Sequence, residues 1–546
     1  MNPKPILPPK KLITVILLSL IILTGFFPRA YHLNFPSIGY HNMKENENIS
    51  IAKYIRDTND FVNRKIYFYD AFSDKNDFGL YPQIPFTAYQ IFIGYKLFGD
   101  NLWFPRLINI IFMLLSILCI FWLTEIFLKE NIYSLASALL LSIMPLGVYF
   151  SRNLQPESGA FFFMLLGNLM FMKFIYAFKK IYWFCFALCL TITTGYKIAF
   201  LIGFVPLLFI FPYKKYISER RPRSILKELL LLIFPVALLF FYWIYTKQIS
   251  FSASWKGRVA FLSVFSISYW EKYGRIIRHY AQSENFTTIY FLLFSLGIIL
   301  LWVNRDKDKS LFGKYLRAWS ITIIPYFMVF SDYLNQHNYY QMPFLGFVCL
   351  TIVYFIKEIS SYIANIFNLT RKLQIFLFIF AAFAVISLPE VKRGIVAPFR
   401  VIYPGTDAIG KALKKRTEKD EKFFIYTFSQ GYAPCIYAER KCGWAESLDE
   451  FKANEQKFKI RYVVIYPYHF FLNMDKNIKD YLSDNYSVKI VGLTKTINSL
   501  FPTILLLEKG GKINIEEFLK TNNPKLETTY NTIDGPLPFY IISSKL

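Results

Sequence analysis

The first 390 residues of the chain alternate between long apolar blocks, nearly free of charge, and shorter polar connections. The hydrocarbon core of a bilayer is about 30 Å thick and needs roughly 20 apolar residues for each crossing helix. The blocks that come close to this length lie at about 12–27, 107–124, 132–150, 158–172, 181–194, 198–212, 229–245, 286–303, 318–331, 341–356 and 373–388. The pattern therefore predicts a polytopic α-helical membrane protein with about 11 transmembrane helices.

Two apolar segments need a separate interpretation. The stretch 84–98 contains Pro85, Gly94 and Lys96, so it is predicted to be an amphipathic helix at the membrane interface and not a span. The first block follows several lysines but lacks a small-residue cleavage site, which predicts an uncleaved signal-anchor.

Beyond about residue 390 the pattern changes to the alternation of an α/β domain. Helical runs are predicted at 405–416, 448–458 and 478–482, and apolar strands at 422–428, 461–466 and 502–508. Helices between strands favour a partly parallel sheet. Residues 1–390 are thus predicted to form the transmembrane domain, and residues 391–546 a C-terminal soluble α/β domain. Because this domain contains neither GxGxxG nor a P-loop, nucleotide binding has no support.

Composition and charge agree with a membrane protein. Hydrophobic residues make up 54% of the chain, while the net charge of +25 taken alone would suggest a nucleic-acid partner. The lysines and arginines gather in alternate connections, as the positive-inside rule requires for cytoplasmic loops. We therefore predict a multi-pass protein of the cytoplasmic (inner) membrane with its N-terminus inside and no nucleic-acid partner. The loops at about 28–102 and 247–285 and the C-terminal domain are predicted to lie outside.

The outer segments contain two further features. The loop 247–285 mixes basic and aromatic residues, which is typical of interface anchoring but also suits an acceptor channel. Cys435 and Cys442 flank a short turn in a compartment that would be oxidising, so they form either a disulfide or two free thiols.

The densest polar cluster follows the first span and contains His41, Lys44, Glu45 and Glu47. Glycosyl transfer to a hydroxyl needs a carboxylate to take the acceptor proton and cations to steady a departing phosphate, and this cluster supplies both. The alternative is a helix N-terminus that carries Glu for the helix dipole. The spans themselves hold almost no ionisable residues, which disfavours an ion-coupled transporter.

The chain resembles the GT-C class of glycosyltransferases in the order and common side of several short motifs. Within that class it resembles the dolichyl-phosphate-mannose protein mannosyltransferases and the bacterial aminoarabinose (lipid A) transferases. Acidic residues follow the first span, as in that class. The other motifs are Leu80-Tyr81-Pro82, Leu97-Phe98-Gly99, Arg106-Leu107, Arg152-Asn153-Leu154-Gln155-Pro156-Glu157, Gly195-Tyr196-Lys197 and His337-Asn338-Tyr339-Tyr340.

The resemblance implies inverting transfer of a sugar from a polyprenyl-phosphate donor to an extracytoplasmic lipid, glycan or protein. An acid of the first loop would act as the base, and basic residues would hold the lipid phosphate. The relatives commonly have Asp-Glu where this chain has Lys44-Glu45, so Glu45 is the first choice for the base and Glu47 the reserve. Asp77-Phe78-Gly79 stands where some relatives have a lysine, so other cations must bind the phosphate.

The remaining candidates lie near the ends of spans, where a lipid phosphate would sit. Glu157 is a third catalytic candidate, and the residues expected to bind the phosphate or donor are Lys44, Arg106, Arg152, Lys197, His337, Tyr339 and Tyr340. Each has a plain structural alternative: Arg106 as an interfacial anchor, Arg152 paired with Glu157, and the His337 segment as part of an aromatic belt. Lys197 interrupts an apolar double span, where an ammonium without a partner is costly.

No cofactor is required by this interpretation. Some members of the class bind a divalent metal, for which His41 and His337 are candidate ligands together with Glu45 or Glu47. Two other functions remain open: a polymerase or ligase that uses polyprenyl-diphosphate-linked glycans, and a non-enzymatic lipid or glycan transporter.

Overall fold

The computed structural model describes residues 9–62, 66–68, 72, 83–219, 222–247, 262–427, 432–495 and 499–544. The Leu80-Tyr81-Pro82 motif, the Asp77-Phe78-Gly79 segment and the first part of the 247–285 loop lie outside these residues.

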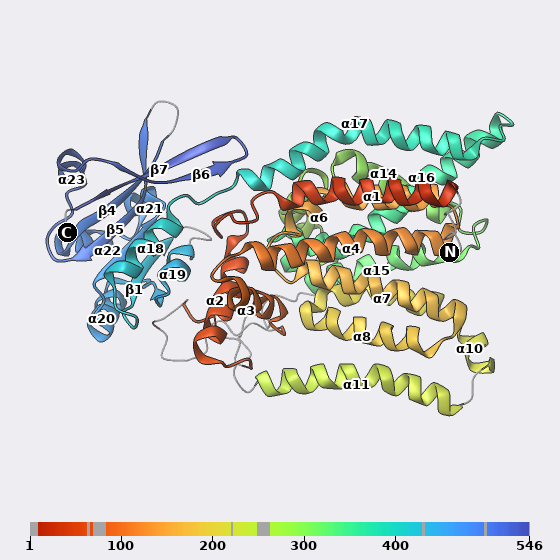
Figure 1. The fold of residues 1–546 in the computed structure, drawn as a ribbon, viewed down its shortest axis with the longest axis horizontal. Helices are drawn as coiled ribbons and strands as arrows, with labels where there is room; N and C mark the ends of the chain where they lie inside the picture. The colour runs from red at the N-terminus through yellow and green to blue at the C-terminus, as the bar shows by residue number, and fades with distance from the viewer. Residues whose placement is uncertain are drawn as a thin grey trace, which may run out of the picture. The chain divides into compact units, whose positions relative to one another are not determined.

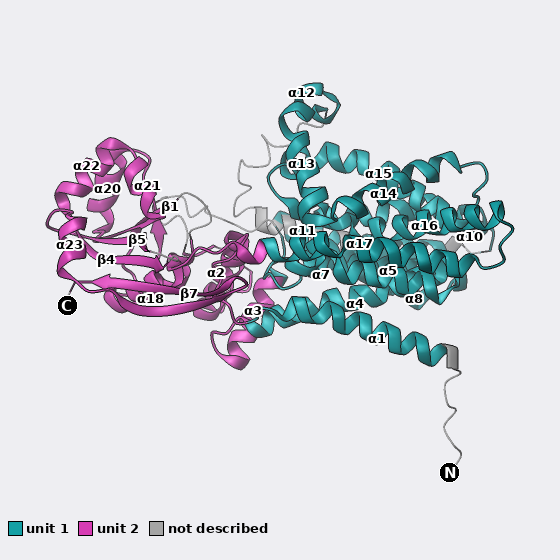
Figure 2. Ribbon diagram, turned by 90° about the horizontal axis from the view of Figure 1, so that it is seen from above, with its two compact units in different colours: residues 1–33, 82–86, 103–397 teal, residues 34–81, 87–102, 398–546 magenta. Residues whose placement is uncertain are grey.

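The chain separates into two compact units (Figure 2). The membrane unit comprises residues 1–33, 82–86 and 103–397, and the sheet unit comprises residues 34–81, 87–102 and 398–546. The grouping joins the first long loop to the C-terminal segment. The domain boundary predicted near residue 390 divides the chain by sequence alone and stays a prediction.

The membrane unit consists of helices (Figure 1). They are α1 (Pro9–Ala30), α4 (Trp103–Leu128), α5 (Asn131–Ile143), α6 (Pro145–Phe150), α7 (Glu157–Ala177), α8 (Lys180–Tyr196), η1 (Ile198–Phe204), α9 (Val205–Ile210), α10 (Tyr213–Glu219), α11 (Pro222–Lys247), η3 (Ser263–Phe265), α12 (Ile267–Tyr269), η4 (Trp270–Gly274), α13 (Arg275–His279), η5 (Tyr280–Asn285), α14 (Thr288–Val303), α15 (Leu311–Leu334), η6 (Asn338–Phe344), α16 (Leu345–Ile366) and α17 (Lys372–Arg400). Every apolar block predicted from the sequence overlaps one of these helices or a consecutive pair.

Several of these helices can cross a bilayer. Among the described residues, 5 helices are long and apolar enough, and the number rises to 7 if each of two bent pairs forms one span. The five are Lys11–Ala30, Trp103–Leu128, Glu157–Ala177, Asn338–Ile366 and Lys372–Arg400. The chain is a multi-pass membrane protein, as predicted, and the count of about 11 transmembrane helices stays a prediction.

The sheet unit combines the first loop with an α/β domain. The loop contributes α2 (Asn42–Thr58) and most of α3 (Phe86–Phe98), a helix where the sequence predicted an interfacial one. The C-terminal segment contains α18 (Thr406–Arg416), β1 (Phe423–Thr427), α19 (Ala433–Ala438), β2 (Cys442–Gly443), α20 (Leu448–Phe458), β3 (Tyr462–Tyr466), α21 (Tyr468–Asn473), α22 (Lys476–Asn485), β4 (Tyr486–Lys495), β5 (Leu500–Lys509), α23 (Ile515–Thr521), β6 (Lys525–Thr532) and β7 (Gly535–Ser543).

The strands form one mixed sheet in the order β2-β1-β3-β5-β4-β7-β6. β1 pairs in parallel with β2 and β3, and the other pairs are antiparallel, so the predicted partly parallel sheet is present. All five residues of β3 are buried, which is typical of a strand covered on both faces of its sheet. Phe451, Phe471 and Leu482 bring α20, α21 and α22 into the core with Val463 and other strand residues.

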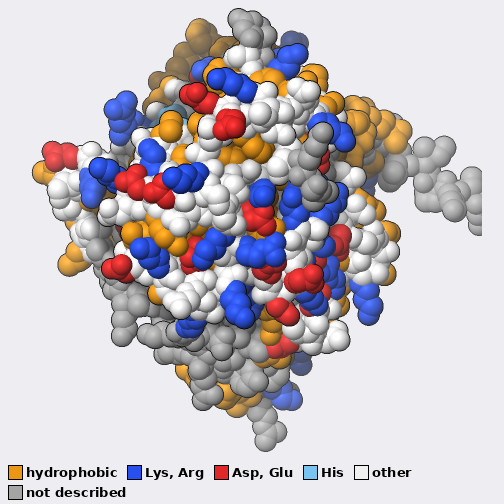
Figure 3. Space-filling view, turned by 90° about the vertical axis from the view of Figure 1, so that its left-hand side faces the viewer, with side chains coloured by type: hydrophobic (Ala, Val, Ile, Leu, Met, Phe, Trp, Pro, Cys, Tyr) orange, Lys and Arg blue, Asp and Glu red, His pale blue; other side chains and the backbone are white. Residues whose placement is uncertain are grey.

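The outer surface on the sheet side is polar. Figure 3 shows basic and acidic side chains interspersed there, with small apolar areas between them. Such mixing is typical of a surface that faces water. It agrees with the predicted α/β domain beyond the last apolar helix.

Candidate active site

Helix α2 carries the acidic cluster of the first loop. It begins at Asn42, and His41 caps it in the left-handed conformation with φ of 55°. Glu45 lies in the first turn, where the partial positive charge of the helix N-terminus stabilises a carboxylate. This placement fits the helix-dipole alternative raised by the sequence and is equally compatible with a base kept ionised.

The Glu45 carboxylate is buried and held by a hydroxyl. Ser37 Oγ donates a hydrogen bond of 2.7 Å to Glu45 Oε2, and Asn46 Nδ2 donates one of 3.1 Å to the Ser37 carbonyl. Glu45 is only 5% exposed, and Ser37 is fully buried. An ionised carboxylate gains from such a donor because charge-assisted hydrogen bonds are stronger than neutral ones. Glu45 is therefore fixed in orientation.

Glu47 lies in a different environment. Its Oε2 pairs with Lys44 Nζ at 2.7 Å across one helical turn. The Lys44 side chain is 40% exposed, so this pair is partly screened by solvent. The structure thus distinguishes two carboxylates that lie two positions apart in the sequence: Glu45 is bonded to a buried hydroxyl, and Glu47 is paired with a lysine.

The membrane unit contains a buried ion pair between two helix ends. Glu157 is the first residue of α7, and Lys197 follows the last residue of α8. Lys197 Nζ lies 2.5 Å from Glu157 Oε1, and both residues are at most 5% exposed. Within the described part of the chain, Glu157 Oε2 is buried without a hydrogen-bond partner. The predicted alternative pairing was with Arg152, whereas the observed partner of Glu157 is Lys197.

A close helix contact brings the two ends together. A Cβ on Gly159 would lie 2.5 Å from the Tyr196 ring, far inside van der Waals contact. Only the absence of a side chain at Gly159 lets Tyr196, at the end of α8, pack on the first turn of α7. The residue after Tyr196 is Lys197, so this contact sets the position of the ammonium group.

Aromatic rings surround the Lys197 ammonium. Its Nζ lies 4.4 Å from the ring centroid of Tyr339 and 4.2 Å from that of Tyr340. The His337 ring stacks on Tyr339 with centroids 5.0 Å apart. Cations are attracted to the faces of aromatic rings, most strongly where water is excluded. The structure therefore joins five predicted residues, Glu157, Lys197, His337, Tyr339 and Tyr340, in one cluster.

The end of the 247–285 loop supports this aromatic segment. In η5, Asn285 Nδ2 donates to the Asn338 carbonyl at 3.1 Å, and Asn338 Nδ2 donates to Glu284 Oε2 at 2.7 Å. Tyr326 on α15 donates to the Tyr340 carbonyl at 2.6 Å. These bonds fix the backbone of η6 and hence the direction of its rings.

The two arginines proposed for phosphate binding are both buried. Arg106 Nη1 donates to the carbonyls of His32 and Leu33 at 3.2 and 2.9 Å, which ties α4 to the segment that follows α1. These carbonyl contacts are a structural role that requires no lipid. Arg152 is 5% exposed and lies in the turn before α7. The assignment of both arginines to a phosphate stays a prediction.

No metal site is evident in the described ranges. No group of three or more His, Cys, Asp or Glu side chains there is arranged to hold an ion. The roles proposed for His41 and His337 as ligands stay untested predictions.

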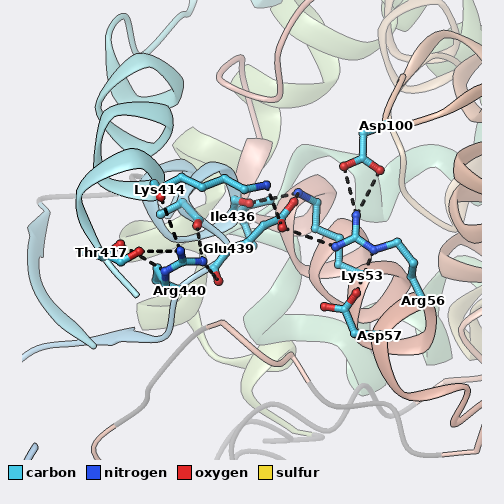
Figure 4. Close-up of polar contacts among 10 residues, drawn as sticks. Lys53, Arg56, Asp57, Asp100, Lys414, Thr417, Ile436, Glu439 and Arg440 are labelled. Carbon is cyan, nitrogen blue, oxygen red and sulfur yellow. Dashed lines mark hydrogen bonds and ion pairs between the residues drawn. The ribbon is translucent and has the colours of Figure 1, made fainter. Parts of the chain in front are cut away.

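Sequence reasoning missed an ion network that joins α2 to the C-terminal domain (Figure 4). Lys53 Nζ lies 2.7 Å from Glu439 Oε1 and donates to the Ile436 carbonyl at 3.2 Å. Arg56 and Lys414 also contact the Glu439 carboxylate, at 3.5 and 2.9 Å. Burial would raise the pKa of Glu439, but the charges and hydrogen bonds of Lys53 and Lys414 outweigh it and lower that pKa to about 2.

Only one signal in the sequence points to this network. Glu439 lies between Cys435 and Cys442, which form a disulfide in the structure. An acid in a cross-linked turn is a candidate contact residue. Two of its partners, Lys53 and Arg56, lie almost 400 positions earlier, so local pattern could not identify them.

The comparisons with known proteins bear on this fold. Residues 82–245 match the family model described as dolichyl-phosphate-mannose-protein mannosyltransferase. No match to the chain was found among curated proteins.

Solved structures are similar over most of the chain. The archaeal oligosaccharyltransferase AglB from Archaeoglobus fulgidus, in complex with an inhibitory peptide and a dolichol-phosphate, has a TM-score of 0.54 at 12% identity and covers 90% of this chain and 74% of its own. ArnT from Cupriavidus metallidurans in the apo state has a TM-score of 0.53 at 12% identity, with coverage of 92% and 98%. ArnT bound to undecaprenyl phosphate is similar to the same extent, at 11% identity. The predicted resemblance to the GT-C class is confirmed, and the chain has the GT-C glycosyltransferase fold.

Proposed function

We propose that the chain transfers a sugar from a polyprenyl-phosphate donor to an extracytoplasmic acceptor with inversion at the anomeric carbon. The observation that carries the proposal is the buried Lys197 and Glu157 cluster with its tyrosine rings, in a protein with the GT-C fold. Charged groups buried at the ends of apolar helices are costly and mark functional sites in membrane proteins. Two of the similar structures contain dolichol-phosphate or undecaprenyl phosphate, which supports a lipid phosphate as the ligand.

The chemical roles follow from the environments described. Glu45, oriented by Ser37, takes the proton of the acceptor hydroxyl as its oxygen attacks the anomeric carbon. The bond from that carbon to the phosphate oxygen breaks, and the lipid phosphate leaves with the electron pair. Lys197 stabilises the charge on this phosphate, and Lys44, Arg106 and Arg152 are the further candidate cations. Glu47 is the reserve base.

A donor assay tests the proposal. Purified full-length protein is incubated with several polyprenyl-phosphate sugars and with lipid, glycan and peptide acceptors, and product masses are measured. Glu45→Gln should lower kcat by at least about 100-fold, because it removes the general base. Glu527→Gln is the matched control, since Glu527 is exposed on β6. Full activity in a Glu45→Gln, Glu47→Gln double variant would contradict the mechanism.

A second function draws support from one comparison. AglB is named an oligosaccharyltransferase. This name supports, as the alternative, transfer of a whole glycan from a lipid carrier. Polyprenyl-diphosphate oligosaccharides in the same assay separate the two functions.

The topology is tested by a reporter fused after Leu388, which should be active on the outer side of the cytoplasmic membrane.

A further inference from the structure

The turn closed by Cys435 and Cys442 contacts the first loop at several points. Both cysteines are fully buried, and they close the chain over a separation of 7 residues. Arg440 braces the turn from within: its Nη2 donates to the Thr417 carbonyl at 2.7 Å, and its Nη1 donates to the Ala438 carbonyl at 3.2 Å. The disulfide therefore closes the turn on itself, and the buried Arg440 guanidinium ties it to Thr417 of the same domain.

Several residues of this turn bind the first loop through hydrogen bonds and ion pairs. Tyr437 Oη accepts a hydrogen bond of 2.8 Å from the Ser37 N–H. The Ile436 carbonyl and the Glu439 carboxylate both bind Lys53 on α2, as described above (Figure 4). Nearer the end of the turn, the Cys442 N–H donates to the Phe68 carbonyl at 3.0 Å. The contacts thus lie before α2, on it and after it.

One of these contacts leads directly to the candidate base. The residue whose N–H is bound by Tyr437 is Ser37, and the hydroxyl of Ser37 donates to Glu45 Oε2. Two hydrogen bonds, of 2.8 and 2.7 Å, therefore connect the cross-linked turn to the Glu45 carboxylate. Nearby, Gly39 pairs with Ile402 in an antiparallel bridge, so the backbone of this segment is held on the α/β domain as well.

We propose that Tyr437 and Ser37 are positioning residues for Glu45, and that the disulfide-closed turn 435–442 is the support that holds them. The inference rests on the proposed function, in which Glu45 is the base. It gives the C-terminal domain a role in catalysis without contact with the reacting atoms: it fixes the direction of one carboxylate.

The first test measures turnover by the full chain in detergent with the donor identified above. Ser37→Ala and Tyr437→Phe should lower kcat about 10- to 100-fold, because a misplaced base can cost that much. The KM for the lipid donor should change less than about threefold, since neither residue is placed at the phosphate. Ser37→Thr, which keeps the hydroxyl, should restore most of the activity, and Tyr176→Phe, an exposed tyrosine on α7, is the matched control.

A pH profile separates positioning from general damage. The Ser37 hydroxyl donates to the ionised carboxylate, so its removal should shift the acidic limb of kcat to higher pH. Ser37→Thr should not show this shift. Variants with wild-type kcat and an unshifted profile, alongside an inactive Glu45→Gln, would overturn the positioning roles and leave the proposed function standing.

Hydrogen exchange tests the support independently of activity. In the full chain, Tyr437→Phe and the double variant Cys435→Ala, Cys442→Ala should both accelerate amide exchange in α2 by at least about tenfold relative to wild type. If the wild type uses no donor, the proposed function fails. Faster exchange in these variants would still support the inference that the turn 435–442 holds α2 in place. Unchanged exchange in Tyr437→Phe would overturn it.

Discussion

Each compact unit pairs a buried lysine with a glutamate, and the two pairs differ in their surroundings. In the sheet unit, Glu439 contacts Lys53, Arg56 and Lys414, and its carboxylate is saturated with cations. In the membrane unit, Glu157 binds Lys197 through one oxygen, while the other oxygen is buried without a hydrogen-bond partner among the described residues. Similar residue types therefore form a closed network in one unit and an incomplete one in the other.

We expect this difference to separate a pair with a structural role from a pair that binds a ligand. A saturated buried network holds elements together, whereas an unsatisfied buried polar atom carries a free-energy cost that a ligand can relieve. The rings of Tyr339 and Tyr340 hold the Lys197 ammonium beside this unsatisfied oxygen. We therefore expect substitutions to separate the two pairs by their effects on transfer.

The largest effect is expected at Lys197. Lys197→Met leaves the Glu157 charge buried without its cation, which costs about 3–5 kcal/mol of stability, and removes a proposed phosphate ligand. The double variant Lys197→Met, Glu157→Gln should recover stability but not transfer. Thermal unfolding and initial rates with a polyprenyl-phosphate sugar measure the two effects, with the exposed Lys525→Met as control. Normal transfer by the double variant would make this pair structural.

A smaller effect is expected from the saturated pair. Lys53→Met alone should destabilise the sheet unit by about 3 kcal/mol, because Lys53 is buried and binds both Glu439 and the Ile436 carbonyl. The double variant Lys53→Met, Glu439→Leu should restore much of the stability and also transfer. Transfer is thus expected to recover in this double variant, whereas it should not recover in Lys197→Met, Glu157→Gln. A double variant that is stable but inactive would instead show that charge at this site takes part in the reaction.

The smallest effect is a dependence of stability on pH. The pKa of Glu439 falls from 4.5 to about 2 in the folded chain, so the native state binds fewer protons there than the unfolded state. The contribution is full above about pH 4.5 and is lost as pH falls toward about 2. The difference in unfolding midpoint between wild type and Glu439→Gln should therefore shrink over that range. A difference that stays constant down to pH 3 would contradict the assignment.

Much of the α/β domain followed from local pattern. The predicted runs at 405–416 and 448–458 coincide with α18 and α20, and the apolar strands at 422–428 and 461–466 coincide with β1 and β3. The first four residues of β1 and all five of β3 are buried, so their apolar runs are continuous and easily seen. β2, β4, β6 and β7 were not predicted. β2 has only two residues, β6 is largely polar and exposed, and β7 contains Pro536 and Pro538.

The candidate site was predictable in part. Order along the chain and position at span ends identified Glu157, Lys197, Tyr339 and Tyr340, which the structure brings together. The partner of Glu157 was not predictable, because Arg152 is nearer in sequence and chemically equivalent as a cation. The contact of Tyr196 with Gly159 places Lys197 beside Glu157, and this contact depends on how α7 and α8 pack.

The sequence by itself determined the class of the protein. Long apolar blocks and alternating basic connections require only local chemistry, and they predicted a multi-pass membrane protein with an α/β segment at its end. The ordered short motifs carried the resemblance to the GT-C class, which implied the glycosyltransferase fold. The tertiary structure decided which of two carboxylates, Glu45 or Glu47, is held by a hydroxyl, and it joined Tyr437 to Ser37 across 400 positions. Such contacts arise when distant segments pack, and neither hydrophobic periodicity nor charge pattern contains that information.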